Sequence, residues 1–317
     1  MSTTTGPAPL ERRRSAVADT TFRAVSLGAG LLVLVLLAMI AVSTTREAWP
    51  AFRAEGLGFV TSSRWAPNEG KFGSLAFVYG TMVVSAVALT FAVPVSIGIA
   101  LFITEVASPR VRRIATFGID LLAAVPSVVF GLWGLNVLVK AAPGFYGDVG
   151  GPASSIPIVG ELFSGTPNGK SFMTAGLILG LMVTPIITSI TREVFATTPA
   201  VQKEAAIALG ATRWEMLRAS VFPHSRGGVI GAVLLGLGRA MGETIAAALV
   251  IGSGSQITAH LFGSGDAMAA RIANEFGEAS GTWRSALIGL GVVLFVLTIL
   301  VNLAARSIVV RAERRAA

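Results

Sequence analysis

The sequence has no cysteine, and charged residues make up only 13% of its 317 residues. Without cysteine the chain forms neither a disulfide framework nor a thiolate metal site, and its two histidines, His224 and His260, lie too far apart in sequence to indicate one. Soluble domains carry about 25% charged residues, so this low charge with 53% hydrophobic residues indicates an integral membrane protein. The net charge is +8, and the basic residues are concentrated next to apolar stretches. A membrane explains this arrangement better than nucleic acid does, so we expect no nucleic-acid partner.

Six stretches of the chain are long and apolar enough to cross a bilayer, which takes about 20 residues. They are 24–42, 72–104, 114–139, 171–191, 227–252 and 285–305. We therefore predict an all-α integral membrane protein with six transmembrane helices. Lys and Arg are about twice as numerous on the side that holds both termini, and the positive-inside rule places that side in the cytoplasm.

The spans divide the chain into a tail, a first helix with its outside loop, a membrane domain and a second, basic tail: 1–23, 24–71, 72–307 and 308–317. The apolar run 24–42 is longer than the core of a signal peptide, so we expect an uncleaved helix. Pro94, Pro126 and Pro185 fall in three consecutive spans. Static packing and gating explain such bends equally well.

In the segment 198–223, which is expected to be cytoplasmic, the sequence predicts two short helices separated by a glycine. Thr198 is expected to cap the first helix, and Gly210 to end it in a left-handed conformation. Thr212 and Glu215 stand three residues apart, the spacing of a capping box that begins the second helix, and Pro223 is expected to end that helix. The apolar side of this helix is formed by Trp214, Leu217 and Val221. The segment is either a docking loop or an ordinary helical hairpin.

Two charges lie inside the predicted span 227–252, where a charged side chain costs at least about 2.5–3.5 kcal/mol. Arg239 and Glu243 are four residues apart, so a continuous helix places them on one face and lets them pair. Small residues surround them: Gly236, Gly238 and Gly242. This pattern fits either a close helix–helix contact or a charge on a substrate path, where the guanidinium fork suits an oxyanion such as phosphate.

The cytoplasmic segment resembles the EAA loop of ABC-importer permeases. The likeness rests on Glu204-Ala205-Ala206, on Gly210 after three further residues, and on Pro223. The ending Ser220-Val221-Phe222-Pro223 departs from the family's Ile-x-Leu-Pro but keeps its apolar character. In that family the loop docks into a cleft of the cytoplasmic ATPase subunit, so the resemblance implies a coupling loop over 198–223.

A narrower resemblance covers residues 57 to 307. Four segments are similar to permeases of the Pst phosphate transport system: Thr104-Glu105 with Ser108-Pro109, 125–134, 203–215, and Leu235-Gly236-Leu237-Gly238-Arg239-Ala240-Met241-Gly242-Glu243-Thr244. The long first outside loop favours the PstC-type over the PstA-type subunit. The resemblance implies a type I ABC importer permease fold in a bacterial cell membrane, with Arg239 and Glu243 on the substrate path.

The same resemblance implies the partners and the coupling residues. The expected partners are a PstA-like permease, two copies of a PstB-like ATPase and an extracytoplasmic PstS-like phosphate-binding protein. Coupling is assigned to residues of the EAA loop: Glu204, Ala205, Ala206, Gly210, Thr212, Trp214, Glu215, Leu217 and Pro223. The glycine-rich run 165–171 has three residues between its glycines where a Walker motif needs four, so no ATP site is expected here. ATP and Mg²⁺ then belong to the ATPase, and this chain is not an enzyme.

Three other functions remain open from the sequence. An ABC importer for sulfate or molybdate has the same composition and the same kind of loop. A proton-coupled secondary transporter would use the Arg239 and Glu243 pair as a relay, without an ATPase. A structural membrane scaffold leaves the two charges without a role.

Overall fold

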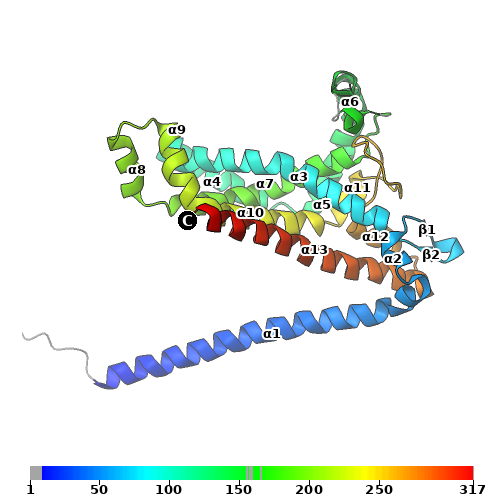
Figure 1. Ribbon diagram of the computed structural model, residues 1–317, viewed down its shortest axis with the longest axis horizontal. Coiled ribbons are helices and arrows are strands. Elements are labelled where there is room, and N and C mark those ends of the chain that lie inside the picture. Colours follow the sequence, from blue (N-terminus) through cyan, green and yellow to red (C-terminus); the bar gives the residue numbers. More distant parts are fainter. Residues whose placement is uncertain (1–8, 155, 157–159, 165, 317) are drawn as a thin grey trace, which may run out of the picture. The chain divides into compact units, whose positions relative to one another are not determined.

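The computed structural model describes residues 9–316 except 155, 157–159 and 165 (Figure 1). Residues 1–8 and 317 of the predicted tails lie outside the described residues. The chain forms two units, one ending at Glu47 and the other beginning at Ala48. Nearly all described elements are helical, which confirms the predicted all-α class.

Within the described residues, five helices are long and apolar enough to cross a membrane. They are Ala18–Glu55, Leu75–Val106, Ser127–Pro152, Phe172–Ala196 and Gly281–Ser307. These belong to α1 (Pro9–Glu55), α3 (Leu75–Leu101), α5 (Ser127–Trp133) with α6 (Val139–Ser154), α7 (Phe172–Ala196) and α13 (Gly281–Ala316). Two π-helical segments, Phe102–Val106 and Gly134–Leu138, continue α3 and join α5 to α6. Helices α1 and α13 thus extend into both predicted tails.

Shorter elements lie between and beyond these helices. At one end of the second unit are α8 (Ala200–Ala208) and α9 (Arg213–Met216), and at the other are α12 (Met268–Glu275) and a small sheet (Figure 1). The sheet pairs β1 (Trp65–Ala66) with β2 (Lys71–Phe72), antiparallel, with Trp65 opposite Phe72. The remaining helical segments are α2 (Gly58–Thr61), α4 (Pro109–Ala123), α10 (Phe222–Met241), α11 (Ile245–Val250) and the 3-10 turns Pro67–Glu69 and Gly160–Phe163.

The predicted third span is not one helix over 114–139. Helix α4 ends at Ala123, and α5 begins at Ser127 with Pro126 in an extended conformation before it. Proline has no N–H to donate, and it disfavours helical geometry at the preceding residue, here Val125. The span therefore continues from α5 as far as Pro152, further along the chain than predicted.

The predicted fifth span, 227–252, is also broken. Helix α10 ends at Met241 and α11 begins at Ile245, so Gly242, Glu243 and Thr244 form the connection. Glycine is a poor helix former, and a carboxylate that bonds to a nearby backbone N–H competes with the helix. Here a Glu243 oxygen accepts a hydrogen bond from the Ala246 N–H at 3.3 Å.

Helices α3 and α7 form the centre of the second unit. Gly176 and Gly180 of α7 face the backbone of α3 so closely that a side chain at Gly176 would collide with Val87. The Ser96 hydroxyl of α3 donates to the Thr184 carbonyl of α7 at 3.1 Å. The small residues allow close approach and dispersion contact along both helices, which makes this pair a rigid support for the elements around it.

A carboxylate ties together the end of the second unit that carries the sheet. Glu275 of α12 accepts hydrogen bonds from the indole N–H groups of Trp65 and Trp283, both at 3.0 Å. Its other oxygen lies 2.5 Å from Nη1 of Arg271. The sheet, α12 and α13 therefore meet at one residue.

The loop before α12 packs against α3 through Asp266. Burial raises the pKa of the Asp266 carboxyl to about 6, against the lowering effect of Arg271. Nε of Arg271 lies 2.8 Å from Asp266 Oδ2, but the N–H does not point at this oxygen, so the contact is an ion pair without a hydrogen bond. The Asp266 carbonyl lies against Gly80, where a Cβ atom would come within 1.8 Å of its oxygen.

We expect Gly80→Ala to lower the free energy of unfolding by about 1–3 kcal/mol, because the added methyl group displaces the Asp266 backbone. Gly98→Ala in the same helix is the matched control, since no heavy atom lies within 4 Å of the added Cβ. The control should be neutral or stabilising. Thermal unfolding midpoints of the two purified variants in detergent test this, and equal midpoints would contradict it.

Candidate functional site

The break between α10 and α11 opens onto a pocket of about 490 Å³. Six residues of α7, α10 and the connection line it: Ile186, Leu235, Gly238, Arg239, Gly242 and Glu243. Both charges singled out in the sequence are therefore at the same pocket. One of its lining residues, Ile186, lies in the middle of α7, which is long and apolar enough to cross a membrane.

Arg239 and Glu243 do not pair, contrary to the prediction from their spacing. No ion pair joins them in the described part of the chain, because α10 ends at Met241 and Glu243 lies beyond the helix. Glu243 is 9% exposed and caps α11 through Ala246. Arg239 is exposed on α10 and has neither a hydrogen bond nor an ion pair with a described residue.

The three glycines near Arg239 have different surroundings. Gly236 packs on Ile187 of α7, where an added Cβ would lie 2.7 Å from that side chain. Gly238 has no heavy atom within 4 Å of such a Cβ. Gly236 thus serves the helix contact, and Gly238 leaves space beside Arg239. An unpaired guanidinium in an open pocket is suited to hold an oxyanion.

Segment 198–223 forms the two predicted helices, α8 and α9. Gly210 between them has φ +87°, the left-handed conformation expected there. The capping box is complete, since Thr212 Oγ1 accepts from the Glu215 N–H at 3.3 Å and Glu215 accepts from the Thr212 N–H at 2.8 Å. Donation by the Thr212 backbone lowers the pKa of the Glu215 carboxyl.

Both predicted ends of this segment are wrong in detail. Pro199, not Thr198, is the N-cap of α8, and the Thr198 hydroxyl is buried without a hydrogen-bond partner. Pro223 does not end the second helix. A π-helical segment, Leu217–Val221, carries α9 directly into α10, which begins at Phe222. The wider turn accommodates the proline, which has no N–H to donate.

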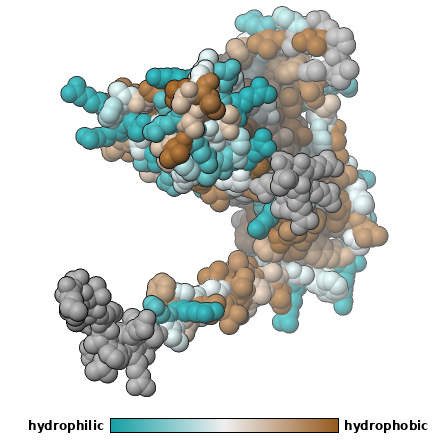
Figure 2. All heavy atoms as spheres, turned by 60° about the vertical axis from the view of Figure 1, so that its left-hand side comes forward, coloured by the Kyte–Doolittle hydropathy of each residue, from teal (hydrophilic) through white to brown (hydrophobic). Residues whose placement is uncertain are grey.

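The outer face of α8 and α9 is apolar and exposed. Val201 is 75% exposed, Leu209 90% and Trp214 61%. Glu204 and Ala205 are also exposed on this face. Figure 2, in which the end with α8 and α9 is turned forward, shows hydrophilic surface interrupted by hydrophobic patches. Exposed apolar side chains of this size on a polar surface are typical of a protein-binding site.

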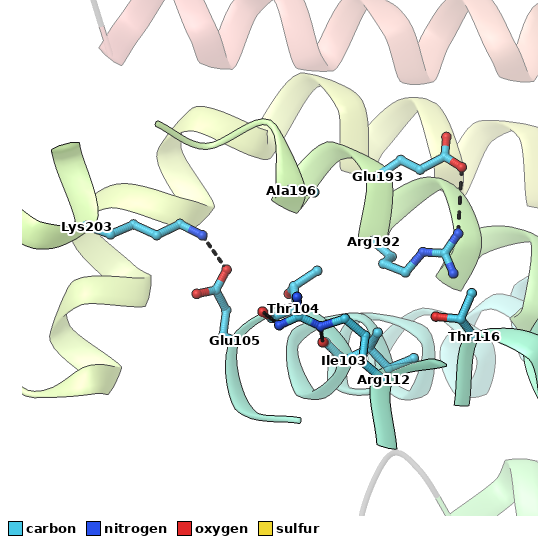
Figure 3. A pocket seen from close by; sticks show the side chains of 9 residues that line it. All are labelled: Ile103, Thr104, Glu105, Arg112, Thr116, Arg192, Glu193, Ala196 and Lys203. Carbon is cyan, nitrogen blue, oxygen red and sulfur yellow. Dashed lines mark hydrogen bonds and ion pairs between the residues drawn. The ribbon is translucent and has the colours of Figure 1, made fainter. Parts of the chain in front are cut away.

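The inner face of the segment is fastened to the helical core. Met216 and Val221 are buried with Ala100 and Phe195. Lys203 of α8 lies 2.5 Å from Glu105 in the π-helical end of α3 (Figure 3), and their side chains are only 21% and 12% exposed. The pair joins residues far apart in the sequence. Glu105 and Lys203 each belong to a segment that resembles the Pst permeases, but no pattern in the sequence indicated that the two side chains are in contact.

The fold and the site together define a class of protein. The family model for the inner membrane component of binding-protein-dependent transport systems matches residues 92–317, and the chain belongs to this class. A chain of a bacterial ABC transporter involved in the import of the acidic polysaccharide alginate has the same fold, with a TM-score of 0.62 at 16% identity, covering 95% of this chain and 99% of that one. The MetNI methionine transporter matches with a TM-score of 0.53 at 18% identity over 75% of this chain and 92% of that one. These likenesses confirm the type I importer fold.

Curated relatives narrow the class to one family. The phosphate transport system permease protein PstC of Mesorhizobium japonicum is 44% identical over 96% of this chain and 93% of its own length. PstC of Xylella fastidiosa strain 9a5c is 43% identical over 95% and 94%, and PstC 2 of Mycobacterium tuberculosis 40% identical over 90% and 90%. The chain therefore belongs to the PstC family of permeases, and it is a multi-pass membrane protein.

Lys203→Glu should lower the free energy of unfolding by about 1–3 kcal/mol, because it leaves two carboxylates together where solvent screens them poorly. The exchanged pair, Glu105→Lys with Lys203→Glu, should regain at least half of the loss. Arg218→Glu, an exposed change in the neighbouring π-helical segment, is the control and should have little effect. Thermal unfolding in detergent measures all three, and no recovery in the double variant would contradict a specific pair.

Proposed function

We propose that this chain is the permease subunit of an ATP-driven importer of inorganic phosphate. Membership in the PstC family supports the substrate, and the unpaired guanidinium of Arg239 in the pocket beside α7 is the observation that carries the proposal. A second, PstA-like permease completes the path. The subunit itself performs no covalent chemistry.

The geometry suggests how phosphate passes this subunit. Arg239 offers two parallel N–H donors to phosphate oxygens and supplies the positive charge that the membrane interior lacks. Glu243 is held by the Ala246 N–H rather than by Arg239, so Arg239 does not have to leave a partner before it binds the anion. The Glu243 carboxylate, which also lines the pocket, repels an anion that moves further toward α11. Phosphate is then bound loosely enough to leave.

Coupling to ATP hydrolysis is assigned to α8 and α9. Their exposed residues, among them Glu204, Leu209 and Trp214, form the surface that docks into the ATPase. Because α9 continues through the π-helical segment into α10, movement of the docked surface is passed to the helix that carries Arg239. Two copies of a PstB-like ATPase bind ATP and Mg²⁺, one beneath each permease. A PstS-like binding protein delivers phosphate on the opposite side, and both termini lie in the cytoplasm.

Arg239→Ala should reduce ATP-dependent phosphate uptake at least about tenfold, because the loss of a charged hydrogen-bond donor costs about 1.5–3 kcal/mol. Uptake of radiolabelled phosphate into vesicles that hold this permease with its PstA-like, PstB-like and PstS-like partners measures this. Arg239→Lys keeps the charge without the fork and should be intermediate. Normal insertion and co-purification with the partners must be confirmed for each variant. Uptake at the wild-type rate by Arg239→Ala would overturn the assignment of Arg239 to the substrate path. Unlabelled sulfate or molybdate serves as a competitor, and if it inhibits uptake where unlabelled phosphate does not, the assignment of phosphate as the substrate is overturned.

Glu204→Lys should uncouple transport by weakening ATPase binding, while the permease remains in the membrane. The measurement is the amount of ATPase that co-purifies with the tagged permease, together with phosphate uptake. Glu278→Lys, the same charge change at an exposed position beyond α12, is the control and should retain the ATPase. Full ATPase recovery with normal uptake by the Glu204 variant would count against the docking role.

A further inference from the structure

A second pocket, of about 420 Å³, lies beside α8, where α3, α4 and α7 meet (Figure 3). Nine residues line it: Ile103, Thr104, Glu105, Arg112, Thr116, Arg192, Glu193, Ala196 and Lys203. Three of these are basic and two are acidic. None of them lines the Arg239 pocket.

Two of the three basic side chains already have partners. Lys203 is paired with Glu105 at 2.5 Å. Arg112 donates through Nε to the Ile103 carbonyl at 2.8 Å and through Nη2 to the Thr104 carbonyl at 2.7 Å, which caps the end of α3. These contacts fix the Arg112 guanidinium at the edge of the pocket and leave its Nη1 group without a bond to a described residue.

Arg192 is the basic residue of this pocket that forms no hydrogen bond with a described residue. Its side chain is 19% exposed and extends across the pocket toward Thr116 (Figure 3). Nη1 is buried without a hydrogen-bond partner, and the carboxylate of Glu193 is 3.7 Å from Nη2 and 72% exposed to solvent. A contact at that distance to an exposed group contributes little. A guanidinium held out of water with an unmet donor costs free energy that an anion in the pocket would offset.

The position of the pocket limits which kinds of anion could bind in it. It lies at the ends of two membrane-spanning helices on the side of the coupling segment, which is the level of the lipid headgroups. Helix α4 beside it exposes Ile114 (72%), Phe117 (68%) and Leu121 (60%), an apolar surface able to contact an acyl chain. Guanidinium groups and a hydroxyl around one cavity suit the oxygens of a phosphate group, whether of a lipid or of free phosphate.

We propose that Arg192, Arg112 and Thr116 bind a phosphate group in this pocket, either the headgroup of an anionic phospholipid or free phosphate on the cytoplasmic side. The site does not require that Arg239 contact the transported anion. Lys203 and Glu105 form one wall of the pocket. A bound phosphate group therefore stabilises the position of α8 in which Lys203 and Glu105 are paired. By reciprocity, docking at α8 changes the affinity of the pocket.

The test compares Arg192→Gln with Arg113→Gln, which removes the same charge from α4 outside the pocket. The full-length chain is placed in nanodiscs of phosphatidylcholine. In the first arm, binding of radiolabelled inorganic phosphate is measured with Arg239→Gln present throughout, so that the Arg239 pocket does not contribute. In the second arm, phosphatidylglycerol is added without inorganic phosphate, and native mass spectrometry measures the lipid retained.

We expect Arg192→Gln to weaken binding at least about tenfold in one arm, with Arg113→Gln like the unchanged protein. Loss in the first arm identifies free phosphate, and loss in the second identifies the lipid. Thr116→Val removes a single hydroxyl and should weaken the same arm severalfold, which provides a second test if Arg192→Gln fails to fold. Equal binding by the Arg192, Thr116 and Arg113 variants in both arms would overturn the proposal. The comparison of Arg192→Gln with Arg113→Gln does not depend on the role proposed for Arg239, so it can be interpreted even if Arg239 does not bind phosphate.

Discussion

In the hydrocarbon interior every backbone N–H and C=O needs a partner within the protein, and the rest of this structure depends on how that requirement is met. A helix meets it without help, so a break in a membrane helix persists only where other groups replace the lost bonds. Two spans are broken, before α5 and before α11. The two helices that follow the breaks pack together, with Gly131 of α5 against Ala246 of α11, and Glu243 supplies an acceptor for the Ala246 N–H.

The break before α11 also determines the chemistry at Arg239. In an unbroken helix Glu243 would lie one turn from Arg239 and neutralise it. Because the helix ends at Met241, the carboxylate is used as a cap and the guanidinium keeps its charge and its donors. The capped break and the unpaired arginine in the pocket are two results of the same local geometry.

The sequence predicted those parts of the structure that depend on neighbouring residues. Gly210 and the Thr212–Glu215 capping box need only three or four residues to define them, and both are present. The all-α class also follows from composition and span length. The breaks were harder to predict, because apolar content continues through Pro126 and Gly242 while the backbone geometry changes. The ion pair between Glu105 and Lys203 depends on how α3 and α8 are placed, which no local pattern encodes.

Pro223 gives the most instructive error, because the rule that proline ends a helix is correct for a regular α-helical ladder. In this chain the ladder widens into the π-helical segment Leu217–Val221, and α10 starts directly at Phe222, whose N–H donates to the Leu217 carbonyl. A helix that ended at Pro223 would leave α8 and α9 as a separate hairpin. The continuous α9 and α10 instead join the exposed side chain of Trp214, near one end, to Arg239 near the other through one helical backbone. The α3–α7 pair, packed closely at Gly176, lies beside this element, since Gly236 of α10 packs on Ile187 of α7.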